Sequence, residues 1–383
     1  MKFTEVRLQT FRNHEATRIE CAPDQNIFLG NNGEGKTNIL EAISYLCLTK
    51  SFYASSDATA VQIGQPGFRV WGKAVSDIEV PYEVEVSYRR ESKEKEIAVN
   101  KGAIEDRSSV IGMFPVVVLS PENAKVTSGT PTDRRRFIDV VISQSNKSYL
   151  LDLIEYRKIL RQRNRILLEA KGGQRASQDV LEPWDEGLVK KGAQISQCRA
   201  RFVNEFAPYL LEAFLQIAGT GEEPSLRYDS SVGISSSMVQ EEMERLCRTA
   251  LDRQRPEELK LGTTLVGPHK DEIVFEINGL ALKAYASQGQ HKTFLVALKI
   301  AEFFYLRERC QETPVLLLDD VFSELDTPRS EKLLSMTTNL GQTFITATDE
   351  ERFMANPGSR DPYRRFIVQQ GRVTHATPAN IAH

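Results

Sequence analysis

The sequence predicts an α/β fold that is interrupted by a mainly helical lobe. Three observations lead to this prediction. A glycine-rich loop stands between an apolar run and a helical pattern near residue 30, apolar residues recur at helical spacing from Asp133 to about Gly219, and a strongly apolar strand ends in two carboxylates at Asp320. Because the loop and the acidic strand flank the helical block, we expect a mixed sheet with flanking helices that is built from two separate parts of the chain.

The first part of this α/β lobe is predicted to cover residues 1–125. Phe3 to Phe11 alternates between apolar and polar residues, as a half-buried strand does, and Arg12-Asn13-His14 follows as a polar interruption. One further short strand is expected to lead into the glycine-rich loop. The charged segment 89–95 is expected to be a solvated hairpin loop. Later segments with the composition of strands are 69–74, 82–88, 96–99 and 115–119.

The glycine-rich loop has the form G-x-x-x-x-G-K-T and runs from Gly30 to Thr37. It follows the apolar run 27–29 and precedes the helical pattern 39–46, which is the context that a phosphate-binding loop requires. Glycines let backbone N–H groups approach a polyphosphate closely, and the start of the following helix attracts anions. We expect Lys36 to reach the β- and γ-phosphates of a nucleoside triphosphate and Thr37 to place its hydroxyl on Mg²⁺.

The inserted helical lobe is predicted to cover residues 126–260. Two long amphipathic helices, the second from about Pro183 to Leu215, are joined by a glycine turn at 171–173 and predict a helical hairpin. We expect a polar linker at roughly 219–237, and then a helix that ends near Arg255-Pro256.

The second part of the α/β lobe, residues 261–383, supplies groups that a phosphate loop needs. Asp319 and Asp320 end an apolar strand, so we expect Asp319 to hold Mg²⁺ and Asp320 to orient or deprotonate the attacking water. The tetrapeptide Ser287-Gln288-Gly289-Gln290 precedes the helix 293–307 and predicts a second anion site. One chain cannot easily use both sites on one triphosphate, so we expect a twofold dimer in which each chain closes the other's pocket.

Composition excludes several classes of protein. The five cysteines are scattered and lack C-x-x-C spacing, which argues against a zinc site or a disulfide scaffold and for a reducing cytoplasm. No apolar run approaches the roughly 20 residues that a membrane span needs, and the first residues do not have the pattern of a signal peptide. The formal charge of −3 excludes a globally basic nucleic-acid binder but not a local basic patch.

Three motifs in combination identify a family. GNNGEGKTN at 30–38, SQGQ at 287–290 and LLLDDVFSELD at 316–326 resemble the RecF family of DNA repair proteins, which are ABC-type ATPases related to the SMC proteins of chromosome structure. The resemblance covers nearly the whole chain and includes Ser-Pro-Glu-Asn at 120–123 and Gly-Pro-His-Lys-Asp at 267–271. It implies an ABC-type P-loop ATPase head with an inserted helical lobe, and ATP and Mg²⁺ as its ligands.

The resemblance also implies roles for individual residues. Lys36 and Asp320 are expected to be catalytic, and Thr37 and Asp319 to be the ligands of Mg²⁺. Residues expected to bind ATP are Arg12, Gly30, Asn31, Asn32, Gly33, Glu34, Gly35, Lys36, Thr37 and Asn38. Residues expected to contact the γ-phosphate of ATP held by the other subunit are Ser287, Gln288, Gly289 and Gln290. The D-loop, which crosses a dimer seam, is expected at Ser323, Glu324, Leu325 and Asp326.

The chain departs from the family pattern at four places. Most ABC-type ATPases carry Glu where Asp320 stands, and the shorter side chain predicts slow hydrolysis that serves as a switch. Ala347-Thr348-Asp349 replaces the switch-loop histidine that is expected after the strand 343–346. Tyr53 stands where RecF proteins often have Arg, and His291-Lys292 replaces a more usual Gln-Arg pair.

The partners are implied by the resemblance alone. An ATP-dependent homodimer is expected to bind double-stranded DNA near single-strand gaps and junctions. With RecR and RecO it would promote RecA loading in recombinational repair, replication restart and the SOS response. A weak, DNA-stimulated ATPase would then release the DNA.

A local basic excess is consistent with DNA binding. Between Pro131 and Arg201 the sequence has 15 Lys and Arg against 9 Asp and Glu, within a chain whose net charge is −3. Such stripes neutralise phosphates without reading bases, although a solvated helix face would have the same composition. The candidate DNA-binding residues are Arg157, Lys158, Arg161, Arg163, Arg165, Lys190 and Lys191.

Other functional classes share part of this pattern. An ABC transporter subunit would share the ATP chemistry but usually carries LSGGQ instead of SQGQ. A small-molecule kinase would use the phosphate loop without a second anion site, and a structural ATP-binding scaffold would not need both Asp319 and Asp320. An SMC-like ATPase whose main target is a protein partner is the alternative nearest to the favoured interpretation.

Overall fold

The structure is a computed structural model, and it describes residues 1–53, 56–172, 178–218, 221–348 and 363–375. The chain divides into two compact units. The first unit contains residues 1–124, 215–219 and 295–383, and the second contains residues 125–214 and 220–294. None of the helices in the described ranges is long and apolar enough to cross a membrane.

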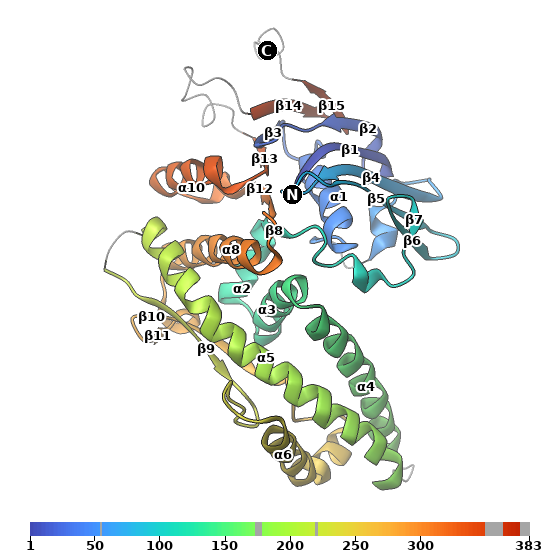
Figure 1. The fold of residues 1–383 in the computed structure, drawn as a ribbon, viewed down its shortest axis with the longest axis vertical. Coiled ribbons are helices and arrows are strands. Elements are labelled where there is room, and N and C mark those ends of the chain that lie inside the picture. The colour runs from blue at the N-terminus through green and yellow to red at the C-terminus, as the bar shows by residue number, and fades with distance from the viewer. Residues whose placement is uncertain (54–55, 173–177, 219–220, 349–362, 376–383) are drawn as a thin grey trace. The chain divides into compact units, whose positions relative to one another are not determined.

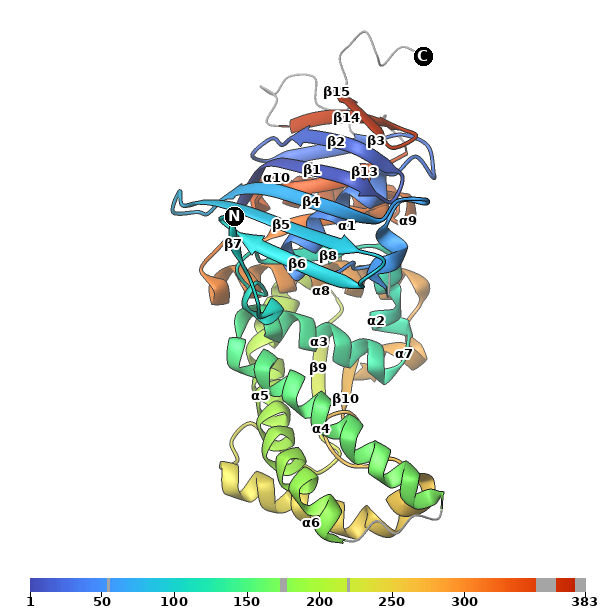
Figure 2. The same ribbon diagram turned by 90° about the vertical axis from the view of Figure 1, so that its right-hand side faces the viewer.

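An antiparallel sheet of six strands forms one layer of the first unit, with the order β2-β1-β4-β5-β6-β7, as Figure 2 shows. Buried and exposed side chains alternate along β4 and β5, so one face of the sheet packs on the core and the other meets solvent. The strands are β1 (Lys2–Phe11), β2 (His14–Glu20), β4 (Gly67–Val75), β5 (Pro81–Arg89), β6 (Glu94–Val99) and β7 (Gly102–Ala103).

A second sheet of six strands has the order β15-β14-β3-β13-β12-β8. Its five strands from β14 to β8 are parallel, and β15 pairs with β14 in the antiparallel sense. The strands β3, β8, β12 and β13 are buried along their whole length, which explains why their sequences are mostly apolar and do not alternate between polar and apolar residues. The strands are β3 (Gln25–Leu29), β8 (Val116–Leu119), β12 (Val315–Asp319), β13 (Thr343–Ala347), β14 (Tyr363–Gln369) and β15 (Arg372–His375).

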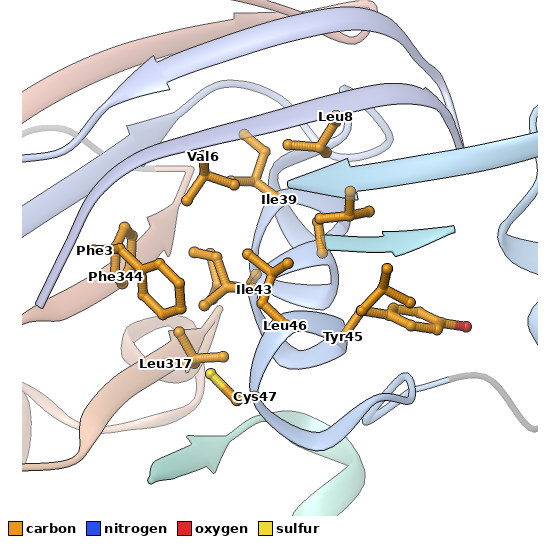
Figure 3. Close-up of a cluster of buried hydrophobic side chains, with 14 of the residues drawn as sticks. Phe3, Val6, Leu8, Ile39, Ile43, Tyr45, Leu46, Cys47, Leu317 and Phe344 are labelled. Carbon is orange, nitrogen blue, oxygen red and sulfur yellow. The ribbon is translucent and has the colours of Figure 1, made fainter. Parts of the chain in front are cut away.

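Helix α1 (Lys36–Leu48) lies between the two sheets of the first unit (Figure 1). Figure 3 shows its Ile39, Ile43 and Leu46 packed among side chains of both sheets, including Val6 of β1 and Leu317 of β12. Nearly every residue of α1 is buried, which is why the sequence has little amphipathic character there. This double burial fixes the start of α1, and with it the phosphate loop, against both sheets.

The other helices of the first unit are short or shared. Helix α9 (Val321–Glu324) and helix α10 (Thr327–Leu340) follow β12, and single 3₁₀ turns occur at 57–60, 107–109 and 121–123. Helices α2 (Ala124–Ser128), α5 (Gln178–Ala218) and α8 (Gln288–Cys310) each have residues in both units.

The second unit is built from helices and one small sheet. Helix α3 (Pro131–Ser145) begins with a reciprocal capping box between Thr130 and Asp133, and the Asn146 side chain caps α4 (Lys147–Lys171) by accepting from the Tyr149 N–H at 3.0 Å. Helices α6 (Gln240–Leu261) and α7 (Leu282–Tyr285) follow later in the chain. The sheet has the order β11-β10-β9, with β9 (Pro224–Asp229), β10 (Glu272–Ile277) and β11 (Leu280–Ala281) all antiparallel.

The Gly-Pro-His-Lys-Asp motif connects these helices and strands. Buried Asp271 accepts hydrogen bonds from the Ser196 hydroxyl on α5 at 3.0 Å, the Ser231 N–H at 2.7 Å and the Tyr228 hydroxyl on β9. His269 lies between the Tyr156 hydroxyl on α4 at 2.7 Å and the Thr264 carbonyl at 3.2 Å. Since a carbonyl only accepts, Nε2 carries a proton. Burial lowers the pKa of His269 to about 4, so the imidazole is neutral near pH 7 and Nδ1 accepts from the tyrosine hydroxyl. The His269 and Asp271 side chains of the motif therefore have structural roles in this unit.

The predicted α/β fold with a mainly helical insertion is confirmed, and the differences lie in its details. The predicted linker 219–237 contains strand β9, which pairs along the whole of β10 and was hidden by its polar sequence. Pro256 lies inside α6 instead of at its end, and Pro183 lies inside α5. Two strands, β2 and β3, stand where one was predicted before the phosphate loop.

The division of the chain also differs from the predicted ranges. The first boundary, predicted at 125/126, lies at 124/125. Residues 261–294, which were assigned to the α/β lobe, cluster with the second unit because β10 pairs with β9. The predicted glycine turn at 171–173 lies partly outside the described residues.

Candidate nucleotide-binding site

The phosphate loop joins β3 to α1 within the first unit. Gly35 ends the loop with a φ of 111°, a left-handed conformation that side chains rarely adopt. A Cβ at this position would lie 2.5 Å from the Asn13 side-chain oxygen. Glycine is therefore required at Gly35 both by backbone geometry and by close approach.

The turn between β1 and β2 supports this loop from behind. The Asn13 amide donates to the Glu34 carbonyl at 2.9 Å, and the buried His14 lies 3.0 Å from both the Gly35 carbonyl and the Thr17 hydroxyl. Burial lowers the pKa of His14, although the backbone groups of Gly35 and Gly371 oppose that shift. These residues are the part of the site that the motif pattern alone did not predict.

The hairpin between β14 and β15 supports the same loop. The Gly371 N–H donates to the Glu34 carbonyl at 2.9 Å, and the Gln370 N–H bonds to the Glu34 carboxylate. Gly371 itself accepts from the Thr17 hydroxyl at 3.1 Å. Glu34, a predicted ATP ligand, thus connects the phosphate loop to the β1–β2 turn and to the β14–β15 hairpin.

The Lys36 side chain folds back over the phosphate loop. Its Nζ donates to the carbonyls of Gly30 at 2.6 Å and Asn31 at 2.8 Å. Burial lowers the pKa of Lys36, and the nearby carboxylates of Asp320 and Asp319 oppose this shift. The ammonium group is therefore held over the loop by two backbone carbonyls.

Thr37 and Asp319 meet across the sheet. The Thr37 hydroxyl donates to Asp319 Oδ1 at 2.8 Å, and the Thr346 hydroxyl donates to the same oxygen at 2.8 Å. Burial raises the pKa of Asp319, while the two hydroxyl hydrogen bonds oppose that shift. Thr346 was not predicted as a site residue, although it is one of two threonines in the otherwise apolar strand β13.

These oxygens fit a magnesium ion that is shared with a nucleotide. Mg²⁺ prefers oxygen ligands and is commonly held by one or two carboxylates together with substrate phosphates. Among the described residues, no group of three or more acidic, histidine or cysteine side chains forms a metal site by itself. A metal ion at the Thr37–Asp319 pair would need further ligands, such as phosphate oxygens and water.

Asp320 has an unusual backbone conformation. Its φ is 48°, and its N–H donates to the Thr346 hydroxyl at 2.9 Å. Aspartate tolerates this left-handed region better than most residues, and such conformations cluster at functional sites. The Ser323 hydroxyl donates to the Asp320 carbonyl at 2.8 Å, so the first D-loop residue holds the same turn.

Arg12, a predicted ATP ligand, forms a partly buried ion pair. Its Nε and Nη2 donate to both oxygens of Glu41 at 2.8 and 2.7 Å, and its Nη1 donates to the Thr59 carbonyl at 2.8 Å. The Glu41 hydrogen bonds raise the pKa of Arg12. Three of the five guanidinium N–H groups are therefore used within the protein.

A cleft of about 880 Å³ adjoins the phosphate loop. Asn13, Gln62, Gln369 and Gln370 line it with side-chain amides, and Arg372 adds a cation. This volume lies in the range of small-molecule sites, and amides can pair with the edge of a nucleobase. The cleft supplies room for a base and a ribose beside the phosphate loop.

The remaining predicted ATP contacts occupy the loop and the first turn of α1. Asn32 and Gly33 are exposed, and Asn38 donates from its side-chain amide to the Asn13 oxygen at 2.8 Å.

Tyr53, one of the residues that depart from the family pattern, is 61% exposed. Thr348 lines the cleft, whereas Asp349 lies outside the described residues.

The SQGQ tetrapeptide belongs to the second unit. Ser287 accepts from the Gln290 N–H at 3.2 Å, and the Gln290 side-chain oxygen accepts from the Ser287 N–H at 2.7 Å. This reciprocal arrangement is a capping box. Ser287 and Gln288 are exposed, so the start of α8 meets solvent in this chain.

The D-loop has a local role as a helix cap. Asp326 accepts from the Arg329 N–H at 3.0 Å and caps α10, and Leu325 is buried. Its proposed place at a dimer seam stays a prediction.

The basic helices differ from the prediction at one residue. Arg163 is fully buried and donates to Asp185 Oδ1 at 2.6 Å, Glu258 Oε2 at 2.6 Å and the Thr264 hydroxyl at 2.8 Å. Its inclusion among the DNA-binding residues was wrong because all its charge is matched inside the second unit. Spacing alone could not separate it from Arg161, two positions earlier, which is exposed.

The other candidate cations lie on the surface of α4 and α5. Arg157, Lys158, Arg161, Arg165 and Lys190 are exposed, whereas Lys191 is partly buried between Asp152 and Glu155. Those two carboxylates raise the pKa of Lys191. Lys158, Arg161 and Lys190 make no ion pair with another described residue.

Comparison with known proteins identifies this combination of elements. Residues 2–374 match the family described as the RecF/RecN/SMC N terminal domain. The chain is 40% identical over 356 residues to the DNA replication and repair protein RecF of Chloroherpeton thalassium, covering 92% of this chain and 96% of that protein. It is 40% identical over 378 residues to the RecF protein of Salinibacter ruber, covering 97% and 91% respectively. The chain belongs to the RecF family.

Solved RecF structures have the same fold. The structure of the recombination mediator protein RecF-ATPrS in the RecFOR pathway aligns with a TM-score of 0.90 and 30% identity, and the alignment covers 98% of each chain. A structure of RecF with ATP aligns with a TM-score of 0.89 at the same identity and coverage. An SMC head bound to the C-winged helix domain of ScpA aligns with a TM-score of 0.55 at 14% identity, which shows the fold alone. The predicted RecF resemblance is confirmed.

Proposed function

We propose that this RecF-family chain is an ATP-dependent DNA-binding protein of recombinational repair. It would bind duplex DNA near single-strand gaps as an ATP-assembled dimer and release it after slow hydrolysis. The observation that carries the ATP part is the 2.8 Å hydrogen bond from Thr37 to Asp319, since it joins a phosphate loop to the acidic strand that such a loop needs. The relatives named DNA replication and repair protein RecF support the DNA part.

The chain's own residues supply most of the ATP chemistry. Lys36 would exchange its carbonyl acceptors for phosphate oxygens, and the N–H groups at the start of α1 would bind the same anion. Thr37 and Asp319 would hold Mg²⁺, which stabilises the charge that develops on the transferred phosphoryl group. Asp320 would orient the attacking water and accept its proton.

A second copy of the chain would complete the site. In the proposed dimer, Ser287 and the first N–H groups of α8 bind the γ-phosphate of ATP held by the partner. The exposure of Ser287 and Gln288 supports this role because an anion can reach the helix start. A structure of a RecF relative with ATP supports nucleotide binding in the family.

The exposed cations of α4 and α5 are the proposed DNA surface. Arg157, Arg161 and Arg165 follow one another at four-residue spacing, so they share a face of α4. Such a stripe would bind the phosphate backbone with strong salt dependence and little sequence preference. RecR, together with RecO, is the proposed protein partner, which the name RecFOR pathway of a solved relative supports. The five free thiols support a reducing cytoplasm as the proposed location.

The proposal is tested by equilibrium binding of a gapped DNA duplex. The protein is titrated with ATP, with ADP and without nucleotide, each at two salt concentrations. We expect tight binding that needs ATP and weakens with salt. This binding should be lost in Lys36→Ala and Ser287→Arg. Lys93→Ala, which removes an exposed lysine on a hairpin far along the chain from both motifs, is the matched control.

Equal DNA affinity in every nucleotide state would contradict the proposal. In that case the nucleotide would control a protein partner instead of DNA, as in the SMC-like alternative.

A further inference from the structure

The start of helix α8 carries a carboxylate that no phosphate-binding motif requires. The Gln290 side-chain nitrogen donates to Glu222 Oε1 at 2.6 Å. The same carboxamide accepts from the Ser287 N–H through its oxygen at 2.7 Å. One carboxamide therefore separates the negative charge of Glu222 from the first residue of the SQGQ tetrapeptide.

The groups left for an anion at this helix start are few. Ser287 Oγ already accepts from the Gln290 N–H at 3.2 Å, which leaves its hydroxyl proton to donate. The N–H groups of Gln288 and Gly289 begin the helix and have no acceptor one turn earlier. An approaching phosphate would bind these donors, and the Gln290 carboxamide alone would stand between the Ser287 N–H and the Glu222 carboxylate.

Glu222 is held where it is. The next residue, Glu223, exchanges two backbone hydrogen bonds with Asn278 in the turn between β10 and β11, both 2.8 Å long. Strand β9 begins at Pro224 and pairs with β10 along its whole length. The segment is thus fixed to the sheet, and Glu222 makes no ion pair with another described residue that would neutralise it.

We infer that Glu222 is an electrostatic brake on ATP-driven dimerisation. This inference rests on the proposed function, in which the start of α8 binds the γ-phosphate of ATP in the partner subunit. A fixed negative charge close to that position repels the phosphate and weakens the dimer. This repulsion keeps dimer assembly reversible at the step where the triphosphate is shared. It acts through the charge of Glu222, whereas the hydrogen bond from Gln290 to Glu222 positions the tetrapeptide.

Charge and hydrogen bonding can be separated by one substitution. Glu222→Gln removes the charge but keeps an oxygen that accepts from the Gln290 amide. Glu222→Ala removes both. Glu223→Gln is the matched control because it makes the same charge change one residue later, on an exposed side chain.

The experiment measures the dimer dissociation constant of the full chain with ATPγS by analytical ultracentrifugation at low and high salt. Glu222→Gln is expected to dimerise about five- to tenfold more tightly than the original chain at low salt, with the gain shrinking at high salt. Glu223→Gln should change the constant less than twofold. Glu222→Ala is expected to dimerise less tightly than Glu222→Gln, since Gln290 loses its acceptor.

A second measurement excludes a purely structural effect. The ATPase rate of Glu222→Gln should reach its plateau at a lower protein concentration, with the plateau itself and the melting temperature of the monomer unchanged. Equal or weaker dimerisation of Glu222→Gln, in a chain that does dimerise with ATPγS, overturns the brake alone. If neither the original chain nor Glu222→Gln dimerises, the proposed function is overturned together with the brake.

Discussion

The Thr37 hydroxyl donates a hydrogen bond to Asp319 Oδ1 at 2.8 Å, although the two residues are 282 positions apart in the chain. The bond connects the first turn of α1 with the end of β12. Because Thr346 donates to the same oxygen at 2.8 Å, Asp319 is held in one orientation by two hydroxyls from two elements. This carboxylate is thus positioned before any metal or nucleotide arrives, which reduces the ordering that binding requires.

The first prediction concerns the cost of keeping Asp319 charged. Burial raises the pKa of Asp319, so the native state binds the proton more readily than the unfolded chain. Stability from this group is therefore present at low pH and lost as the pH rises through the raised native value. Without nucleotide at pH 7, Asp319→Asn should melt about 2 °C higher than the original chain.

The same substitution should abolish the chemistry. Asp319→Asn removes the charge that we propose attracts Mg²⁺, and we expect ATP hydrolysis to fall roughly 100-fold or more. Melting is measured by differential scanning fluorimetry and hydrolysis by phosphate release. A lower melting temperature together with normal hydrolysis would contradict the role assigned to this residue.

The second prediction concerns Asp320 as the residue that positions water. Its side chain is shorter than the glutamate usual at this position, so turnover should stay below roughly 10 per second, near the median of enzymes. Asp320→Asn should lower the hydrolysis rate by roughly 100-fold, since a general base contributes 10²–10⁴. ATP affinity, measured by fluorescence titration, should change little in Asp320→Asn and fall strongly in Lys36→Ala. Loss of ATP binding in Asp320→Asn would instead indicate damage to the loop.

The third prediction concerns pH and the Gly-Pro-His-Lys-Asp motif. Burial lowers the pKa of His269 to about 4, from its ordinary value of 6.5. The unfolded chain binds a proton below pH 6.5, but the native chain does not, so stability is lost as the pH falls from 6.5 towards 4. His269→Gln cannot take up this proton and keeps both a donor and an acceptor for Thr264 and Tyr156.

Melting temperatures at pH 7 and pH 4.5 test this prediction. On acidification, the melting temperature of the original chain should fall by several degrees more than that of His269→Gln. Substitution of the exposed His375 by Gln is the control and should leave the pH response unchanged. If the melting temperatures of all three proteins fell equally between pH 7 and pH 4.5, His269 would not control acid stability.

The sequence was sufficient to predict the phosphate loop, the acidic strand and the α/β fold, because each follows from local chemistry. A glycine-rich loop before a helix can be recognised from local sequence alone. The same holds for a buried apolar strand that ends in a carboxylate, as β12 does at Asp319. The supports of the loop, such as His14 and Gly371, could not be predicted. Local sequence does not indicate these contacts: His14 lies 21 positions before the Gly35 carbonyl that it contacts, and the hydrogen bond between Thr17 and Gly371 spans 354 positions.

Strand β9 was missed for a similar reason. Its sequence between Pro224 and Asp229 is polar at alternate positions and short, so the surrounding glycine and serine residues favoured a linker. Pairing with β10 supplies the stability that local preference lacks. The extension of α6 past Pro256 likewise depends on Glu258, which is buried against Arg163.

The final prediction separates two arginines that look alike in the sequence. Arg163→Ala would leave the buried Glu258 without its cation and Asp185 with Arg255 as its remaining ion-pair partner, and we expect a loss of roughly 3–5 kcal/mol in the free energy of unfolding. Arg161→Ala removes an exposed cation two positions away and should change stability by less than about 0.5 kcal/mol. Its effect should appear in DNA binding instead, as a weaker affinity and a smaller dependence on salt. Chemical denaturation and duplex binding, measured on both variants, test this pair. If Arg161→Ala left DNA affinity and its salt slope unchanged, the stripe on α4 would be only a solvated helix face.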